Sequence, residues 1–237
     1  MSHFAVAVIL KDINDLEKVL APYQENNMGD CPKEYMEFFS VTEKCKEEYA
    51  KENEATKIKY PILKEYIERC WGYEYDVEKK DFGYWENPNA KWDYWVLCAK
   101  GKLARYKDAK MPLGYCKLNE FDKAFNNVAY KKALRFWELV VEEQPLKEGE
   151  QKPFNFYRKE YYIERFGTKE EYAKIEATPH YWAYVLDGKW YEKGTMGWFG
   201  FGSDTKSSEA AYLEQWLEAI NNPKYQDYYI AVVDCHI

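Results

Sequence analysis

The first segment with groups suited to ligand binding is a polar turn followed by rings and lysines. Asn87 and Asn89 flank a proline, and an asparagine amide can donate and accept hydrogen bonds at once. Stacking rings and ammonium groups would suit a nucleotide, whose base and phosphate they match. The alternative is a turn that only leads into a core strand, with solvated lysines. The other residues of this block that we expect to bind a ligand are Lys91, Trp92, Trp95 and Lys100.

A glycine-rich segment, residues 194–202, is the second candidate. Four glycines interrupt its large apolar side chains, and glycine lets a backbone approach a ligand closely. We therefore expect Met196, Gly197 and Trp198 to touch the ligand. The segment lacks the spacing of a Walker A loop and follows a hairpin, so it is not expected to be a dinucleotide-binding loop. The alternative is a glycine-rich bulge that packs on a sheet.

The end of the chain supplies the third candidate, because Asp234, Cys235 and His236 are consecutive. Side chains alternate along a strand, so Cys235 points away from its two neighbours and is poorly placed to form a nucleophile pair with His236. Asp234, His236 and His3 converge if the terminal strands are neighbours. These three are the catalytic candidates, and the alternative is a buried hydrogen-bonded group without a metal.

Composition excludes several classes of protein. The 237 residues carry a formal net charge of −7, which argues against a binder of duplex DNA that neutralises phosphates. No apolar run is long enough for a transmembrane helix, and the N-terminus does not have the pattern of a signal peptide. The six cysteines form no CxxC pair and indicate reduced thiols in a cytoplasmic protein. Aromatic residues make up 19% of the chain, which is typical of recognition surfaces and also of a tyrosine-rich core.

The predicted strands and helices around these residues suggest an α+β fold. Apolar runs predict strands near 3–10, 93–99, 180–186 and 228–233, and Asp187-Gly188 predicts a hairpin turn. Helices are expected over 33–53, after a cap at Asn119, after the capping box that Thr168 opens, and after Ser207 or Ser208. This order favours a small, mainly antiparallel sheet with helices on one side, of which a ferredoxin-like sandwich is one example.

We expect one domain, residues 1–237. A helical insertion is predicted around 33–70. The segment 144–153 is the best linker candidate and marks where the domain would subdivide.

Four segments together resemble a widespread, largely uncharacterised family of bacteriophage and prophage proteins. The first is Ser-His-Phe-Ala-Val-Ala-Val-Ile at 2–9 together with Leu-Ala-Pro-Tyr-Gln-Glu at 20–25. The others are Asn-Pro-Asn-Ala-Lys-Trp-Asp at 87–93, Met-Gly-Trp-Phe-Gly at 196–200 and Val-Asp-Cys-His-Ile at 233–237. In that family the second segment runs on into Gly-Gly-Arg-Trp, whereas residues 98–101 read Cys-Ala-Lys-Gly here. A lysine does not offer the bidentate anion contact of an arginine. The resemblance implies a viral protein in the cytoplasm of an infected bacterial host.

These observations favour a binding protein over an enzyme. We expect an anti-defence sponge that sequesters a small anionic nucleotide-type signalling molecule, without a cofactor and without a membrane partner. Two other classes stay open. One is a nucleotide-cleaving enzyme that uses the terminal residues. The other is an inhibitor that presents an acidic surface to a defence effector such as a CRISPR nuclease. A homo-oligomer is also compatible with the sequence.

Overall fold

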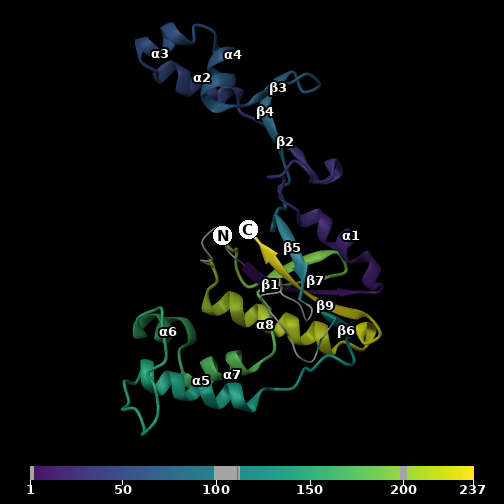
Figure 1. The fold of residues 1–237 in the computed structure, drawn as a ribbon, viewed down its shortest axis with the longest axis vertical. Helices are drawn as coiled ribbons and strands as arrows, with labels where there is room; N and C mark the ends of the chain where they lie inside the picture. Colours follow the sequence, from purple (N-terminus) through teal and green to yellow (C-terminus); the bar gives the residue numbers. More distant parts are fainter. Residues whose placement is uncertain (1–2, 99–110, 112, 198–201) are drawn as a thin grey trace. The chain divides into compact units, whose positions relative to one another are not determined.

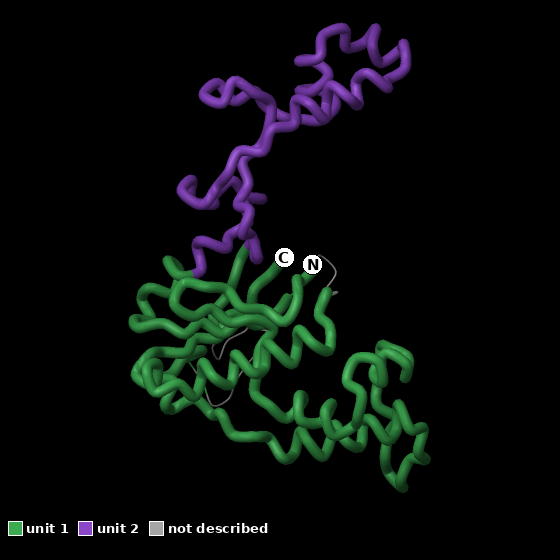
Figure 2. The backbone as a smooth tube through the Cα atoms, turned by 180° about the vertical axis from the view of Figure 1, so that it is seen from behind, with its two compact units in different colours: residues 1–19, 94–237 green, residues 20–93 purple. Residues whose placement is uncertain are grey.

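The computed structural model describes residues 3–98, 111, 113–197 and 202–237. The chain forms two compact units, residues 1–19 with 94–237 and residues 20–93 (Figure 2). The helices expected in the insertion around 33–70 lie in the second unit. The segment 144–153 lies within the first unit and contains no helix or strand.

A mixed sheet is the centre of the larger unit (Figure 1). Its order is β5-β9-β1-β7-β8, with β6 also paired to β9. Only β1 and β7 are parallel, and the other pairs are antiparallel. The strands are β1 (His3–Leu10), β5 (Tyr94–Leu97), β6 (Tyr115–Lys117), β7 (Ala183–Leu186), β8 (Lys189–Glu192) and β9 (Tyr229–His236).

The predicted α+β class with a mainly antiparallel sheet is confirmed, but the strand order is not ferredoxin-like. In a ferredoxin-like sheet, a strand would separate β1 from the strand parallel to it. Here β7 pairs directly with β1, and its hairpin partner β8 lies outside it. The hairpin turns at Asp187 and Gly188, whose φ angles of 50° and 73° are those of the expected tight turn.

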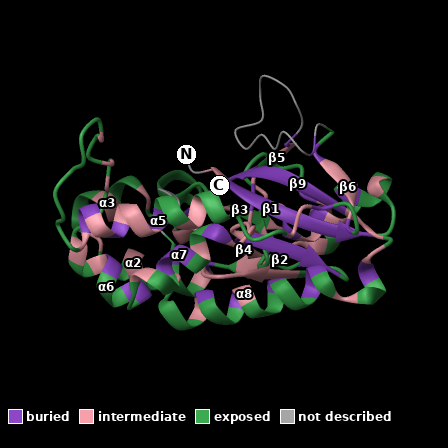
Figure 3. Cartoon of the chain, turned by 90° about the horizontal axis from the view of Figure 1, so that it is seen from below, coloured by how far each residue is buried: buried purple, intermediate pink, exposed green. Residues whose placement is uncertain are grey.

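Helix α8 (Lys206–Asn221) packs against this sheet, and Figure 3 shows the central strands almost entirely as buried residues. Trp216 of α8 is fully buried beside Tyr184 of β7. Thr205 caps the helix by accepting from the Ser208 amide, so the predicted cap at Ser207 or Ser208 is wrong by two or three positions. Ser208 instead closes the capping box as the third helical residue, bonding the Thr205 amide.

Three further helices form a second apolar cluster in the same unit. They are α5 (Asn127–Val140), α6 (Lys159–Phe166) and α7 (Lys169–Ala177). Thr168 caps α7 as predicted, but Asn119 caps no helix. Helix α5 begins after Asn126, whose side chain accepts two amides, while Phe121 is buried in the core under the sheet. The apolar periodicity therefore continues across a segment that is not helical.

The smaller unit has its own sheet and core. Its strands pair in the order β2-β4-β3, and Val41, Cys45, Tyr66, Ile67 and Phe82 form the core. The prediction of helix throughout 33–53 is wrong at 37–40, because those residues pair with β4. The elements are β2 (Glu37–Ser40), α2 (Thr42–Lys51), α3 (Glu54–Lys59), α4 (Leu63–Tyr66), a π-turn (Ile67–Trp71), β3 (Glu74–Asp76) and β4 (Asp81–Glu86).

Short elements complete the fold. Helix α1 (Leu16–Leu20) follows β1, and single 3₁₀ turns span Ile13–Asp15, Ala21–Tyr23, Lys33–Tyr35 and Pro223–Tyr225.

Among the helices that the structure describes, none is long and apolar enough to cross a membrane.

Candidate functional site

The polar turn is built into the interior of the smaller unit. Asn87 is 1% exposed, and its Nδ2 donates to Pro22 O and Gln24 O, both at 2.9 Å. Its Oδ1 accepts the Asn89 amide at 2.9 Å, so these bonds use both donors and an acceptor of the Asn87 amide. The packing alternative accounts for these contacts, and the ligand-binding role of the turn stays a prediction.

The remaining residues of that block are divided between the two units. Trp92 is buried in the smaller unit, and the backbone amide of Lys91 donates to Tyr23 O at 2.8 Å. Trp95 is half-buried in β5 of the larger unit, opposite Cys235. Lys100 lies outside the described residues.

The glycine-rich segment is described in part. Met196 forms a bridge with Gly202, Gly197 is half-buried, and Trp198 lies outside the described residues. A Cβ atom at Gly194 would lie 2.5 Å from the Asp204 amide nitrogen, and one at Gly202 would overlap the Trp182 ring. Close packing inside the protein is therefore one reason for glycine at these two positions.

The terminal candidates do converge, because β1 and β9 pair with His3 opposite His236. His3 Nδ1 lies 3.1 Å from Asp234 Oδ1, and the two imidazole centroids are 5.0 Å apart. Tyr94 stacks on His236 with centroids 4.5 Å apart. Cys235 lies on the opposite face of the strand, as its alternation predicts. No group of three or more histidine, cysteine or acidic side chains in the described part of the chain could hold a metal ion.

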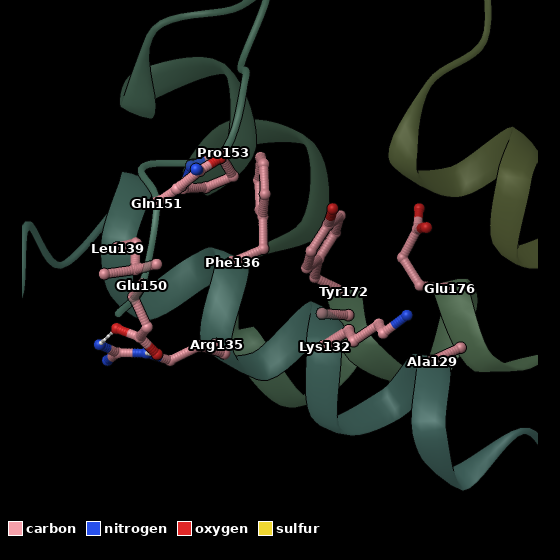
Figure 4. Close-up of a pocket in the computed structure, with 11 residues that line it drawn as sticks. Ala129, Lys132, Arg135, Phe136, Leu139, Glu150, Gln151, Pro153, Tyr172 and Glu176 are labelled. Carbon is pink, nitrogen blue, oxygen red and sulfur yellow. Dashed lines mark hydrogen bonds and ion pairs between the residues drawn. The ribbon is translucent and has the colours of Figure 1, made fainter. Parts of the chain in front are cut away.

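A cavity of about 500 Å³ lies between α5, α7 and residues 150–153 (Figure 4). Its volume and mainly apolar wall are those of a small-molecule site. Figure 4 shows the rings of Phe136 and Tyr172 side by side, and their centroids are 5.7 Å apart. The other lining residues are Ala129, Lys132, Ala133, Arg135, Leu139, Glu150, Gln151, Pro153 and Glu176.

The two ends of this cavity differ in charge. At one end Arg135 pairs with Glu150 and Glu138, so its donors are engaged. At the other end lie the ammonium of Lys132 and the carboxyl of Glu176 (Figure 4). Lys132 is exposed, and within the described residues it forms no ion pair. It is therefore a cation with its donors available at the mouth of the cavity.

Burial by the surrounding protein raises the pKa of two groups that line the cavity. Burial raises the pKa of Tyr172 far above its usual value. Desolvation also raises the pKa of Glu176, although more than a third of this residue is exposed. Glu176 lines two cavities, so part of the residue is exposed while the surrounding protein desolvates its carboxyl.

The second cavity that Glu176 lines contains a network of buried charges. Arg165 pairs with Asp204 and, at 3.0 Å, with Glu209, whose other oxygen accepts from Lys193 at 3.0 Å. Burial lowers the pKa of His180, whose Nδ1 donates to Thr178 O at 2.7 Å. Asp204 and Glu209 balance Arg165 and Lys193 here, and Glu176 adds a further carboxyl, so this cavity has no excess positive charge for an anionic ligand.

Sequence reasoning did not find the Figure 4 cavity. Its residues come from α5, α7 and the segment expected to be a linker, and no local motif joins them. The one available signal was the apolar face of α5, which includes Phe136 and Val140 and was interpreted as core. No family model, curated protein or solved structure matches this chain.

Proposed function

We propose that this chain binds a small nucleotide-type ligand in the cavity between α5 and α7. The observation that carries the proposal is the pairing of two ring walls, Phe136 and Tyr172, with an available cation, Lys132, in one cavity of suitable volume. The base would lie on the rings and a phosphate would meet the ammonium group. Gln151 adds an amide that can donate to and accept from a base edge.

The geometry restricts how a base would bind. A ring inserted between two others needs them about 7 Å apart, which is two van der Waals contact distances. The centroids of Phe136 and Tyr172 are only 5.7 Å apart and their planes differ by 37°. The base would therefore stack on the cavity-facing side of these rings and would not be sandwiched between them.

In the biological role that we propose, binding sequesters the ligand. A phage protein that holds a nucleotide signal in the host cytoplasm lowers its free concentration and so antagonises the immune system that depends on it. This role rests on the resemblance of the four sequence segments to phage proteins.

The test is retention of a ligand from a panel of cyclic and ADP-ribose-type nucleotides. The protein is incubated with the panel, washed and heat-denatured, and the released compounds are identified by mass spectrometry. We expect one compound to be recovered intact, with roughly tenfold weaker binding after Phe136→Ala. Lys132→Ala should also weaken binding, whereas Lys131→Ala, an exposed lysine of the same helix that does not line the cavity, should not. Retention of no compound, or equal loss in the two lysine variants, would exclude this site.

Cleavage of a nucleotide is the second candidate, favoured by the contact between His3 and Asp234. A carboxylate that orients an imidazole is the arrangement that general-base catalysis uses. Under this alternative the panel compound is released in altered form, and His3→Gln prevents the alteration while retention continues. Intact ligand from both proteins would leave binding alone.

A further inference from the structure

Residues 151–159 differ in charge from the rest of the chain. The segment reads Gln-Lys-Pro-Phe-Asn-Phe-Tyr-Arg-Lys, with three cations, three aromatic rings and no acid, in a chain whose net charge is −7. It joins the cavity wall to α6, and only Lys159 belongs to a helix or strand. Positive charges and aromatic rings are therefore concentrated in a segment that is almost entirely neither helix nor strand.

Two rings of this segment are directed into solvent. Phe154 is 88% exposed and Phe156 is 70% exposed, whereas Asn155 between them is half-buried. The Asn155 Nδ2 donates to Tyr157 O at 3.0 Å, which holds the intervening residue against the backbone. Neighbouring large apolar side chains with this exposure gain nothing from the fold and are typical of an interaction site.

The surrounding contacts leave both rings and two cations available. Tyr157 already stacks on Tyr161 with centroids 4.0 Å apart, and Phe156 meets only the edge of Tyr157. Lys159 pairs with Glu143 at 2.8 Å. Lys152 and Arg158, on either side of the exposed rings, form no close ion pair with any residue that the structure describes, and Lys152 lies near enough to Glu143 to contribute to the lowered pKa of that carboxyl.

We propose that residues 152–158 bind single-stranded nucleic acid. Phe154 and Phe156 stack on two bases, and Lys152 and Arg158 meet the phosphates that flank them. The two Cα atoms of the phenylalanines are at most about 7 Å apart, a reach that suits successive bases of an extended strand. This surface adjoins the Figure 4 cavity, because Pro153 lines that cavity, but the two phenylalanines do not line it.

Physical chemistry favours this partner over a duplex or a membrane. The base faces of a duplex are covered by their own stacking, so exposed phenylalanines find no surface there. A lipid core would leave the backbone groups of a segment that is neither helix nor strand without partners. A single strand offers ring faces and negative charge together, and it leaves that backbone in water.

The test measures fluorescence anisotropy of a labelled oligothymidylate with the full chain at low and moderate salt. We expect salt-dependent binding that the double variant Phe154→Ala/Phe156→Ala weakens at least tenfold. Lys152→Ala/Arg158→Ala should reduce the slope of log affinity against log salt by about 1.4, from two phosphate contacts at about 0.7 each. The matched control is Ile58→Ala/Val77→Ala, which removes two similarly exposed apolar side chains from the smaller unit and should bind as wild type.

Three results would overturn the proposal. They are absence of binding at low salt, equal affinity for a duplex of the same length, and full affinity in the double phenylalanine variant. A parallel measurement with phosphatidylserine vesicles distinguishes a lipid surface, since binding to vesicles alone would contradict a nucleic-acid partner. All four substituted residues are exposed, so the variants should keep the wild-type Tm, and a circular dichroism melt checks this.

Discussion

Arg135 holds Glu150 through two hydrogen bonds, Nε to Oε1 at 2.9 Å and Nη2 to Oε2 at 2.5 Å, across a separation of 15 residues. The same guanidinium donates to Pro145 O at 3.0 Å. One side chain of α5 therefore fixes the segment that forms a wall of the Figure 4 cavity. This wall depends on the ion pair between Arg135 and Glu150, which lies on the surface of α5 and not in an apolar core.

The first prediction concerns the titration of Glu150. The hydrogen bond from Arg135, and then the one from the Lys147 amide, lower the pKa of Glu150 to about 2. The pKa of a glutamate in an unfolded chain is about 4.3, so the contribution of this pair to stability is complete above that pH. It is lost as the pH falls from about 4.3 toward about 2. The NMR shift of the Lys147 amide, 2.7 Å from Glu150 Oε2, reports the midpoint.

Arg135→Ala should move this midpoint up toward the ordinary glutamate value. Glu150→Gln is the control, because it removes the titrating group and should abolish the transition at Lys147. An unchanged midpoint in Arg135→Ala would mean that another group fixes the carboxylate. Weaker ligand binding in Arg135→Ala would in addition connect the wall to the proposed site.

Local signals in the sequence were sufficient where a few neighbouring residues decide the structure. The run of apolar residues from His3 to Leu10 becomes β1, and Asp187-Gly188 adopts the two positive φ angles of a tight hairpin. Thr168 caps α7 because a hydroxyl can accept the amide three residues later. In each case the physical cause lies within about one turn or one strand.

Contacts between residues far apart in the sequence determine the features that local sequence patterns did not predict. Residues 37–40 form a strand because β4, more than forty residues later, pairs with them. Phe121 follows the helical spacing of α5, yet its ring packs against Trp216 at 6.4 Å between centroids. The Figure 4 cavity needs Phe136, Tyr172 and Gln151 from three segments, and no periodicity within one segment predicts such a meeting.

The second prediction is that Asn87 stabilises the fold through its three buried hydrogen bonds. Asn87→Ala removes two donors from the Pro22 and Gln24 carbonyls and the acceptor of the Asn89 amide. A buried group left without a partner costs about 1–3 kcal/mol, so the unfolding free energy should fall by at least about 2 kcal/mol. Urea denaturation measures the loss. Asn89→Ala, at an exposed position, is the control and should change little. Normal stability with lost ligand retention would instead return Asn87 to the binding site.

The third prediction concerns the pair formed by the two ends of the chain. Asp234 is 2% exposed and contacts His3, so Asp234→Asn replaces a charged acceptor by a neutral amide of the same size. Hydrogen bonds to charged groups contribute about 1.5–3 kcal/mol, and we expect a loss at the lower end of this range because His3 is partly exposed. A double-mutant cycle tests this contact. It compares the thermal stabilities of wild type, Asp234→Asn, His3→Asn and the double variant. Additive losses would show that the contact between the two residues does not stabilise the fold.

The fourth prediction is that Gly202 is glycine because Trp182 needs the space. A Cβ at Gly202 would overlap the Trp182 ring and lie 2.5 Å from Asp204 Oδ1. Both neighbours make further contacts that a shift would disturb, since Lys193 lies 5.1 Å above the Trp182 ring centre and Asp204 pairs with Arg165. Overpacking of this kind costs about 1–3 kcal/mol, so Gly202→Ala should lower the Tm by several degrees.

A second substitution separates the clash from a general loss of flexibility. Trp182→Phe shortens the ring that a Cβ at Gly202 would meet, so the double variant Gly202→Ala/Trp182→Phe should lose less stability than the sum of the single variants. Chemical denaturation of the four proteins gives this coupling free energy directly. Strict additivity would show that the ring is not the obstacle. Preserved stability in Gly202→Ala with loss of ligand retention would mean that the glycine serves close approach of a ligand, as the spacing of glycines in 194–202 first predicted.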